Sequence, residues 1–366
     1  MKTSRIHSVV NRPRRTSHLR LRLVFLCAFL SIAWAHFLPA QSPAPPDSTI
    51  IQTPQILHTW GSEEMQVLLQ TWESAFTSRQ PAVRFVDTLK GTETAQAALF
   101  SHVAEMAAMS RPILPLERHV MFRREHHLPL ELVVATGSPT RLDRGFALGV
   151  FVSEQNPVTH LSLDQLDRIF GDQRSGAWDE KFVWHPEAAR SAASNIRTWG
   201  QAGLTGKWAA RPVHVYGYPV SIYSPTSGPM LSFRKEVMQG GDIWNPDLQE
   251  YPNSPSILAV LEHDPEGIAY GCACDRRPGT KLIAVARSAG ATAVALSRKT
   301  VADRSYPLTR SAYLYIDREP GQPIDRALHE FLLYILSPEG QRAVRDVTGY
   351  LPLPPALARE QLEKLQ

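Results

Sequence analysis

The sequence predicts an α/β protein. Apolar runs of strand length alternate with segments of helical periodicity along almost the whole chain, which is the pattern of an α/β architecture. The chain has 366 residues, of which 43% are hydrophobic, so it can bury the core of one large or two medium domains. Its 21 glycines and 29 prolines follow no period, which excludes a collagen-like chain, and the apolar share excludes disorder.

The first clear elements follow residue 55. A short strand is expected at 56–57, and Ser62 is placed to cap a helix with one apolar face. The residues of that face are Met65, Leu68, Leu69, Trp72 and Phe76. Further strands are expected at 83–86, 106–109, 131–135 and 147–152, with a helix at 94–103. Another helix opens at 161–166, where Ser162 and Gln165 have capping-box spacing. The last two helices are expected at 325–336 and 338–347.

The N-terminal segment has the pattern of a secretion signal. Residues 1–35 carry seven Lys/Arg and no acid, and an apolar core at 23–30 is followed by small residues. This run is shorter than the roughly 18–20 residues that a membrane anchor needs. We therefore expect a signal peptide at 1–35, a proline-rich linker at 36–54 and a mature chain in the periplasm. Without this leader the chain has 32 basic and 35 acidic residues and is slightly acidic. The charge balance of the rest of the chain therefore does not favour nucleic-acid binding.

The remaining cysteines and the catalytic motifs point away from an enzyme. Cys272 and Cys274 are favoured as two ordinary thiols at a turn, with a tight disulfide as the alternative. The sequence has no nucleophile elbow, zinc-protease motif or Walker loop, so no catalytic residue, metal site or cofactor is predicted. Ser232 and Lys235 have the spacing of a nucleophile–base pair, but a solvated helix face explains them better. His126 and His127 are expected in a polar surface loop.

Six stretches, read in order, resemble one known family. They are Gly61-Ser-Glu-Glu-Met65; Lys90-Gly-Thr92; Ala104-Glu-Met-Ala-Ala-Met-Ser-Arg111; Asn156-Pro157 with Leu161-Ser-Leu-Asp-Gln-Leu-Asp-Arg-Ile-Phe170; Tyr306-Pro-Leu-Thr-Arg310; and Phe331-Leu-Leu-Tyr-Ile-Leu-Ser-Pro-Glu-Gly-Gln341 with Gly349-Tyr-Leu-Pro352. Together they resemble the phosphate-binding periplasmic proteins of ABC transporters, from about residue 56 to residue 355.

This resemblance implies a two-lobed periplasmic-binding-protein fold with two crossover strands and a ligand cleft between the lobes. Lobe one would hold 48–152 and 306–366, and lobe two 153–305. The expected function is capture of phosphate or a related oxyanion, by a monomer, for an ABC transporter permease. The alternative is the same fold used as a sensor or scaffold for a different solute or a protein partner.

The resemblance also implies which residues bind the ligand. An oxyanion is held by free N–H groups at helix N-termini and by hydroxyls, and a carboxylate can accept the proton of phosphate. The implied set is Ser62, Glu64, Met65, Gly91, Thr92, Glu105, Ser227 and Gly228.

Three positions depart from the family pattern. Glu64 replaces a ligand-binding threonine, Tyr218 replaces an arginine, and Pro229 replaces a donor in a Ser-Gly-Thr turn. Each of these changes removes contacts to a bound anion, and these contacts would be worth roughly 1–3 kcal/mol. Either another basic residue compensates, with Arg111 the nearest candidate, or the ligand is not phosphate. For Glu64 we expect a carboxylate that occupies the anion's place, with a solvent-facing helix cap as the alternative.

Overall fold

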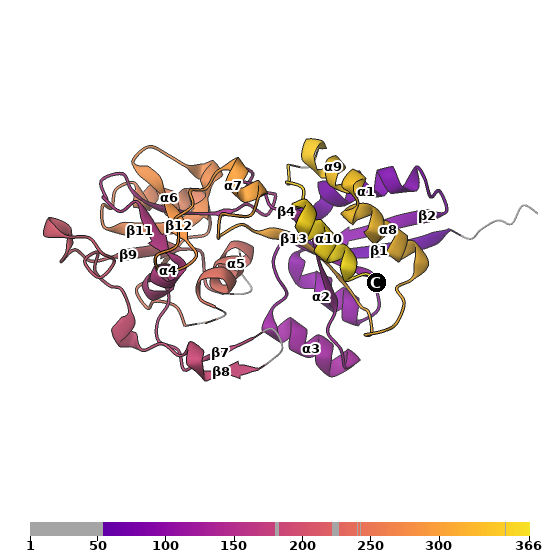
Figure 1. Ribbon diagram of the computed structural model, residues 1–366, viewed down its shortest axis with the longest axis horizontal. Coiled ribbons are helices and arrows are strands. Elements are labelled where there is room, and N and C mark those ends of the chain that lie inside the picture. Colours follow the sequence, from indigo (N-terminus) through magenta and orange to yellow (C-terminus); the bar gives the residue numbers. More distant parts are fainter. Residues whose placement is uncertain (1–53, 180–182, 222–226, 240, 242, 348) are drawn as a thin grey trace, which may run out of the picture. The chain divides into compact units, whose positions relative to one another are not determined.

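The computed structural model describes residues 54–179, 183–221, 227–239, 241, 243–347 and 349–366 (Figure 1). The predicted signal peptide lies outside these residues, as does all of the predicted linker except Pro54. No helix in the described part of the chain is long and apolar enough to cross a membrane.

The first lobe is built on a five-stranded sheet in the order β2-β1-β3-β13-β4. Its strands are β1 (Gln55–Gly61), β2 (Val83–Leu89), β3 (Met106–Met109), β4 (Leu130–Thr136) and β13 (Ser311–Ile316). β1 runs parallel to β2 and β3, whereas β13 is antiparallel to both of its neighbours. The strand predictions at 56–57, 83–86, 106–109 and 131–135 are therefore confirmed, with some strands longer than expected.

Helices cover both faces of this sheet. They are α1 (Gln66–Thr77), α2 (Thr92–Phe100), α3 (Pro115–Glu125), α8 (Arg326–Leu336), α9 (Pro338–Val347) and α10 (Pro355–Glu363). One buried cluster joins Trp72 and Phe76 of α1 to Phe331 of α8. A second cluster joins Leu99 of α2 to Tyr315 on β13. Helices α8 and α9 match the sequence prediction closely, while α3 and α10 were not expected.

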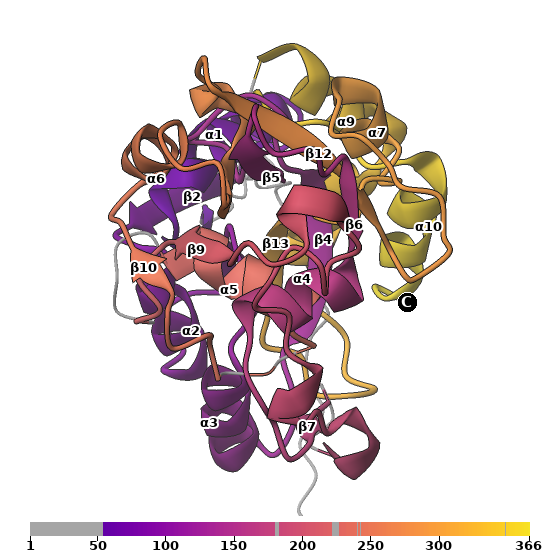
Figure 2. The same ribbon diagram turned by 90° about the vertical axis from the view of Figure 1, so that its left-hand side faces the viewer.

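The second lobe is built on a six-stranded sheet in the order β10-β9-β11-β5-β12-β6. Its strands are β5 (Leu148–Ser153), β6 (His160–Ser162), β9 (His214–Gly217), β10 (Gln249–Glu250), β11 (Gly267–Cys272) and β12 (Thr280–Ala286). Four helices belong to this lobe: α4 (Leu163–Phe170), α5 (Ser227–Val237), α6 (Ser254–Leu261) and α7 (Arg298–Ala302). β7 (Ala177–Trp178) and β8 (Trp184–His185) form a small antiparallel pair (Figure 1), and β7 is labelled at the lower end of the view in Figure 2.

The predicted capping box at the start of α4 is confirmed. The Ser162 hydroxyl accepts from the backbone N–H of Gln165 at 3.2 Å, and the Gln165 side chain accepts from the N–H of Ser162 at 3.0 Å. This reciprocal pair satisfies two N–H groups that the first turn of a helix leaves free.

The chain passes twice between the two sheets, over residues 137–147 and 303–310. The two connections are joined by hydrogen bonds: the Leu148 N–H donates to the Leu308 carbonyl at 3.0 Å, and the Gly137 N–H to the Arg310 carbonyl at 2.9 Å. Lobe one was expected to extend to residue 152, with the strand at 147–152 at its end. Instead β5 is a central strand of the second sheet, buried at all six positions, so the first crossing precedes residue 148 rather than following 152.

Two further expectations are corrected by the structure. Cys272 and Cys274 are joined by a disulfide, because the turn after β11 brings their Cα atoms to 5.1 Å. Ser232 was expected on a solvated helix face, but it is buried on α5 and its hydroxyl accepts from the Arg310 guanidinium at 3.1 Å.

Candidate functional site

A small pocket lies where β1 and β3 end. Ser62 follows β1 and Ser110 follows β3, and because the two strands are parallel neighbours their carboxyl ends meet at one edge of the sheet. The two hydroxyl oxygens are 3.3 Å apart and both residues are buried. We call this cavity, of about 140 Å³, the Ser62 pocket. It is lined by Ser62, Glu63, Glu64, Gly91, Thr92, Glu93, Ser110, Arg111, Ser227, Gly228 and Pro229.

Gly61 allows the chain to enter this pocket. Its φ of +152° is unfavourable for other residues, and a Cβ atom at this position would lie only 1.9 Å from the carbonyl oxygen of Ala108. Close backbone packing therefore requires glycine here. Immediately afterwards, the Ser62 hydroxyl accepts from the Glu64 N–H at 3.3 Å, so Ser62 is a cap as predicted, but of a short 3₁₀ turn and not of α1, whose N-cap is Met65. The turn that follows is a short 3₁₀ helix over Glu63–Met65, and α1 begins only at Gln66.

The N-terminus of α2 forms a second wall of the pocket. Gly91 is the N-cap, with φ of +101°, and its N–H donates to the carbonyl of Gly61 at 3.1 Å. Thr92 is the first residue of the helix and lines the pocket. The first N–H groups of a helix have no partner within it and carry its positive dipole end, so this wall favours an anion.

The third wall comes from the start of α5 in the second lobe. Ser227 is buried, and its hydroxyl donates to a carboxylate oxygen of Glu93 on α2 at 3.4 Å. Gly228 and Pro229 follow it along the wall. Since proline has no N–H, Pro229 removes one backbone donor from this helix start.

Two arginines lie at the pocket, and they differ in their partners. Arg111, the basic residue suggested by the sequence, lines the pocket but is held by Glu117 through two bonds of 2.8 Å each. Arg310, from the second crossing, donates to the Ser110 carbonyl at 2.9 Å and lies against the start of α5. It is buried, its Nη1 atom has no hydrogen-bond partner, and no carboxylate in the described residues pairs with it. Arg310 is therefore the cation with capacity to bind an added anion.

Three glutamates, Glu63, Glu64 and Glu93, line the pocket as well. Glu64 accepts from the Gly145 N–H at 3.2 Å, so its side chain is turned to the first crossing and not simply to solvent. Glu93 is half exposed at the rim, 3.9 Å from the Arg111 guanidinium. These groups oppose a fully charged anion, but each can accept a hydrogen bond from a protonated one.

The structure brings six of the eight expected ligand residues together. Ser62, Glu64, Gly91, Thr92, Ser227 and Gly228 all line the Ser62 pocket. Met65 is fully buried in the core of the first lobe and does not line it. Glu105 precedes β3, at the opposite end of the strand from Ser110, where it accepts from the His58 N–H at 2.6 Å.

Sequence reasoning missed Ser110, Glu93 and Arg310. Ser110 and Arg310 both stand inside the stretches that carried the family resemblance, so their positions in those motifs were the available signal. Tyr218, which replaces the expected arginine, does not line the pocket. Burial raises the pKa of its hydroxyl above the usual value, so Tyr218 stays neutral, and a phenol has no cationic form that could replace the arginine.

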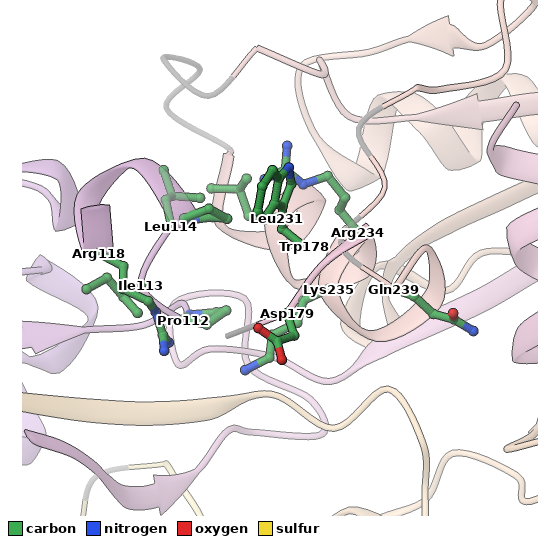
Figure 3. Close-up of a pocket in the computed structure, with 11 residues that line it drawn as sticks. Pro112, Ile113, Leu114, Arg118, Trp178, Asp179, Leu231, Arg234, Lys235 and Gln239 are labelled. Atoms are coloured by element: carbon green, nitrogen blue, oxygen red, sulfur yellow. The ribbon is translucent and has the colours of Figure 1, made fainter. Parts of the chain in front are cut away.

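A second cavity, of about 280 Å³, lies between the start of α3, the β7 hairpin strand and α5 (Figure 3). Its walls are largely apolar, with Ile113, Leu114, Trp178 and Leu231 among them. No helix N-terminus lines it except that of α3, whose first residue, Pro115, has no N–H. Arg118, Arg234 and Lys235 also line this cavity, so basic charge alone does not distinguish the two sites. The Ser62 pocket fits a small anion better because hydroxyls and the N-terminus of α2 line it.

Comparison with known proteins places the chain in a family. A family model described as the PBP superfamily domain matches residues 43–339. The phosphate-binding protein PstS of Pseudomonas aeruginosa is 29% identical over 310 residues, which cover 84% of this chain and 86% of that protein. The Staphylococcus aureus protein of the same name is 24% identical over 179 residues, covering 48% of this chain and 50% of that protein.

Solved structures agree on the fold. A crystal structure of PstS from Borrelia burgdorferi aligns with a TM-score of 0.54 at 15% identity, covering 82% of this chain and 99% of that one. An ABC-type phosphate transport receptor from Vibrio cholerae aligns with a TM-score of 0.52 at 17% identity, covering 81% and 100%. The predicted two-lobed binding-protein fold is thereby confirmed.

Proposed function

Because the chain belongs to the PBP superfamily, we propose that it is a solute-binding protein that captures phosphate or a related oxyanion and delivers it to an ABC transporter. Relatives named as phosphate-binding proteins and as a phosphate transport receptor support this function. The observation that carries it is the Ser62 pocket, where hydroxyls, a helix N-terminus and the buried Arg310 converge, and Arg310 has no carboxylate partner in the part of the chain that the structure describes.

The pocket has the size and donors that a tetrahedral oxyanion needs. Its volume of about 140 Å³ is well below the roughly 300–1,000 Å³ of pockets for larger organic ligands. Ser62, Thr92 and Ser227 would donate from their hydroxyls, and the first turns of α2 and α5 from their backbone. Arg310 would supply the positive charge that the family's usual arginine position, here Tyr218, does not.

The carboxylates at the pocket would separate phosphate from sulfate. Phosphate keeps a proton near neutral pH and can donate it to Glu93 or Glu64, whereas sulfate has none to offer. Sulfate has no proton to donate to a carboxylate, so the interaction between the two is only electrostatic repulsion. The same groups would weaken binding of any fully deprotonated oxyanion.

We also propose that the protein acts outside the cytoplasm and is not an enzyme. The basic, then apolar, leader at 1–35 is the support for export. Hinge closure of the two lobes around the ion would create the form that the transporter recognises. The alternative role as a sensor or scaffold is not favoured by the relatives found.

Calorimetric titration with phosphate, sulfate, molybdate and tungstate tests the proposal. We expect one site per chain that binds phosphate more tightly than sulfate. In Glu93→Gln the ratio of the two affinities should be smaller than in the wild type. Saturable binding of none of the four ions would contradict the proposed function. Phosphate affinity that is unchanged in both Glu93→Gln and Ser62→Ala would mean that the ion binds outside the Ser62 pocket.

A further inference from the structure

A second group of ligand-type side chains lies beyond the far end of α2 from the Ser62 pocket. His102 follows α2, Glu125 is the last residue of α3, and Asp317 follows β13. Gly91 and His102 stand at opposite ends of the same nine-residue helix, which is about 14 Å long. This group is therefore separate from the Ser62 pocket.

We propose that His102, Glu125 and Asp317 bind a divalent transition-metal ion, with Zn²⁺ the preferred one. A ring nitrogen of His102 and one oxygen of each carboxylate all lie within 4.8 Å of one another. Ligands of tetrahedral Zn²⁺, at about 2.0–2.2 Å from the metal, are about 3.4 Å apart. Nδ1 of His102 is 3.4 Å from Oδ2 of Asp317, and Nε2 is 3.6 Å from Oε1 of Glu125, so the imidazole must turn to bring one nitrogen to both oxygens. Arg124, which donates to Oε1 of Glu125 at 3.0 Å, must release that oxygen.

His127 holds one of these ligands in place. Its Nε2 atom lies 2.7 Å from Oδ1 of Asp317, and its Nδ1 atom lies 2.9 Å from the carbonyl oxygen of Glu125. The other oxygen of Asp317, Oδ2, is the one that faces His102. Such histidine–carboxylate support orients a metal ligand and is itself buried, as is most of the His127 ring here. His127 is thus a positioning residue for the site.

The position of His102 supports a ligand role. Its backbone has φ of +56° just after the end of α2, a place that glycine takes at lowest cost. Its imidazole nevertheless stands between two carboxylates. Both carboxylates that would share a metal ion with it therefore lie beside its ring nitrogens.

Another histidine in the chain offers a matched comparison. His185 also contacts two carboxylates, at 3.1 Å from Asp179 and 2.5 Å from Glu187. Its two ring nitrogens face different carboxylates, as those of His102 do, but these three residues do not form one of the converging groups among the described residues. The other converging group, Cys272, Cys274 and Asp275, has its two sulfurs in the disulfide.

The test is calorimetric titration of untagged, chelator-treated full-length protein with zinc chloride, in a buffer free of phosphate. We expect saturable binding that falls at least about 100-fold in His102→Gly and Asp317→Asn, and about 10–100-fold in His127→Ala. His102→Gly suits the left-handed backbone, so loss of folding does not obscure the result. His185→Ala should leave zinc affinity unchanged.

Three outcomes overturn the metal site. They are no saturable zinc binding by the wild type, binding that survives both His102→Gly and Asp317→Asn, and an equal loss in His185→Ala. Phosphate titration of the same variants keeps this result separate from the proposed function, since none of these residues lines the Ser62 pocket.

Discussion

Arg310 donates through Nη2 to the backbone carbonyl of Ser110 at 2.9 Å, tying the second crossing to the wall of the Ser62 pocket. The guanidinium is buried, yet no carboxylate in the described residues neutralises it. Burying a charge without a counter-charge is costly, so this arrangement is most stable when an anion occupies the adjacent pocket. Through Arg310, the second crossing between the two sheets therefore contributes directly to the proposed ligand site.

Removing the Arg310 charge should weaken phosphate binding strongly. Hydrogen bonds to charged groups contribute about 1.5–3 kcal/mol, so Arg310→Met should raise the phosphate Kd roughly 10–100-fold, with Arg310→Lys in between. Arg304→Met is the control: it removes a charge from the same crossing, but its side chain contacts Thr136 and Ser311 instead of the pocket. Unchanged affinity in a folded Arg310→Met protein would refute this role.

Glu64 should limit the affinity of the wild-type protein. Its carboxylate lines the pocket and accepts from the Gly145 N–H, so it repels an incoming anion. We expect a wild-type phosphate Kd roughly above 10 µM, and Glu64→Thr should lower it at least about tenfold, equivalent to ~1.4 kcal/mol.

A remote charge change controls for net charge in that experiment. Glu154→Thr removes one exposed carboxylate from the second lobe and should leave the Kd unaltered. Tight binding by the wild type, or no gain in Glu64→Thr, would mean that Glu64 does not compete with the ligand.

Most of the fold could be predicted because its signals are local. Apolar runs marked the strands of the first sheet, and the spacing of Ser162 and Gln165 marked the start of α4. The role of 147–152 could not be predicted this way, because an apolar run looks the same in a crossing strand and in a central strand buried on both faces. Helix α3 was missed because its sequence is rich in charged residues and only Met121 is fully buried.

The candidate site was harder to predict, because it depends on contacts between distant segments. Residues at a helix start, such as Ser62 and Thr92, carry a local signal, and the structure brings both to the pocket. Arg310 is 200 residues from Ser110 in the sequence. The residues beside it in the sequence could not predict that it has no carboxylate partner among the described residues. Arg111 was the basic residue that the sequence suggested, but the structure places Glu117 against it.

Gly61→Ala should both destabilise the protein and disturb the pocket. The added Cβ would lie 1.9 Å from the Ala108 carbonyl oxygen, so the backbone of β1 and β3 must separate near Ser62. We expect a loss of roughly 2–4 kcal/mol in the free energy of unfolding, measured by urea denaturation, and weaker phosphate binding.

Gly203→Ala separates steric overlap from backbone strain. Gly203 also has a positive φ, of +106°, but a Cβ there meets no atom within 4 Å. It should cost only about 1–2 kcal/mol and leave phosphate binding intact. Equal losses in the two variants would show that close packing against Ala108 does not matter.

A buried pair of carboxyl groups should make the first lobe sensitive to pH. Glu73 on α1 is 8% exposed, and burial, followed by the nearby charge of Asp87 on β2, raises its pKa from 4.5 to about 8. Burial also raises the pKa of Asp87. Because the folded pKa of Glu73 lies above the unfolded one, the native state holds a proton that the unfolded state releases between these two values.

The direction of the pH effect follows from this difference. The contribution of Glu73 is fully present below pH 4.5, declines as the pH rises and is lost once the pH passes about 8. Urea unfolding from about pH 5 to about pH 9 should therefore show a larger fall in stability for the wild type than for Glu73→Gln, which stays neutral throughout. Glu319→Gln, the same change at an exposed glutamate, should behave as the wild type does. Parallel pH profiles for the wild type and Glu73→Gln would show that Glu73 is ionised in the native state across this range, which would contradict the raised pKa of Glu73.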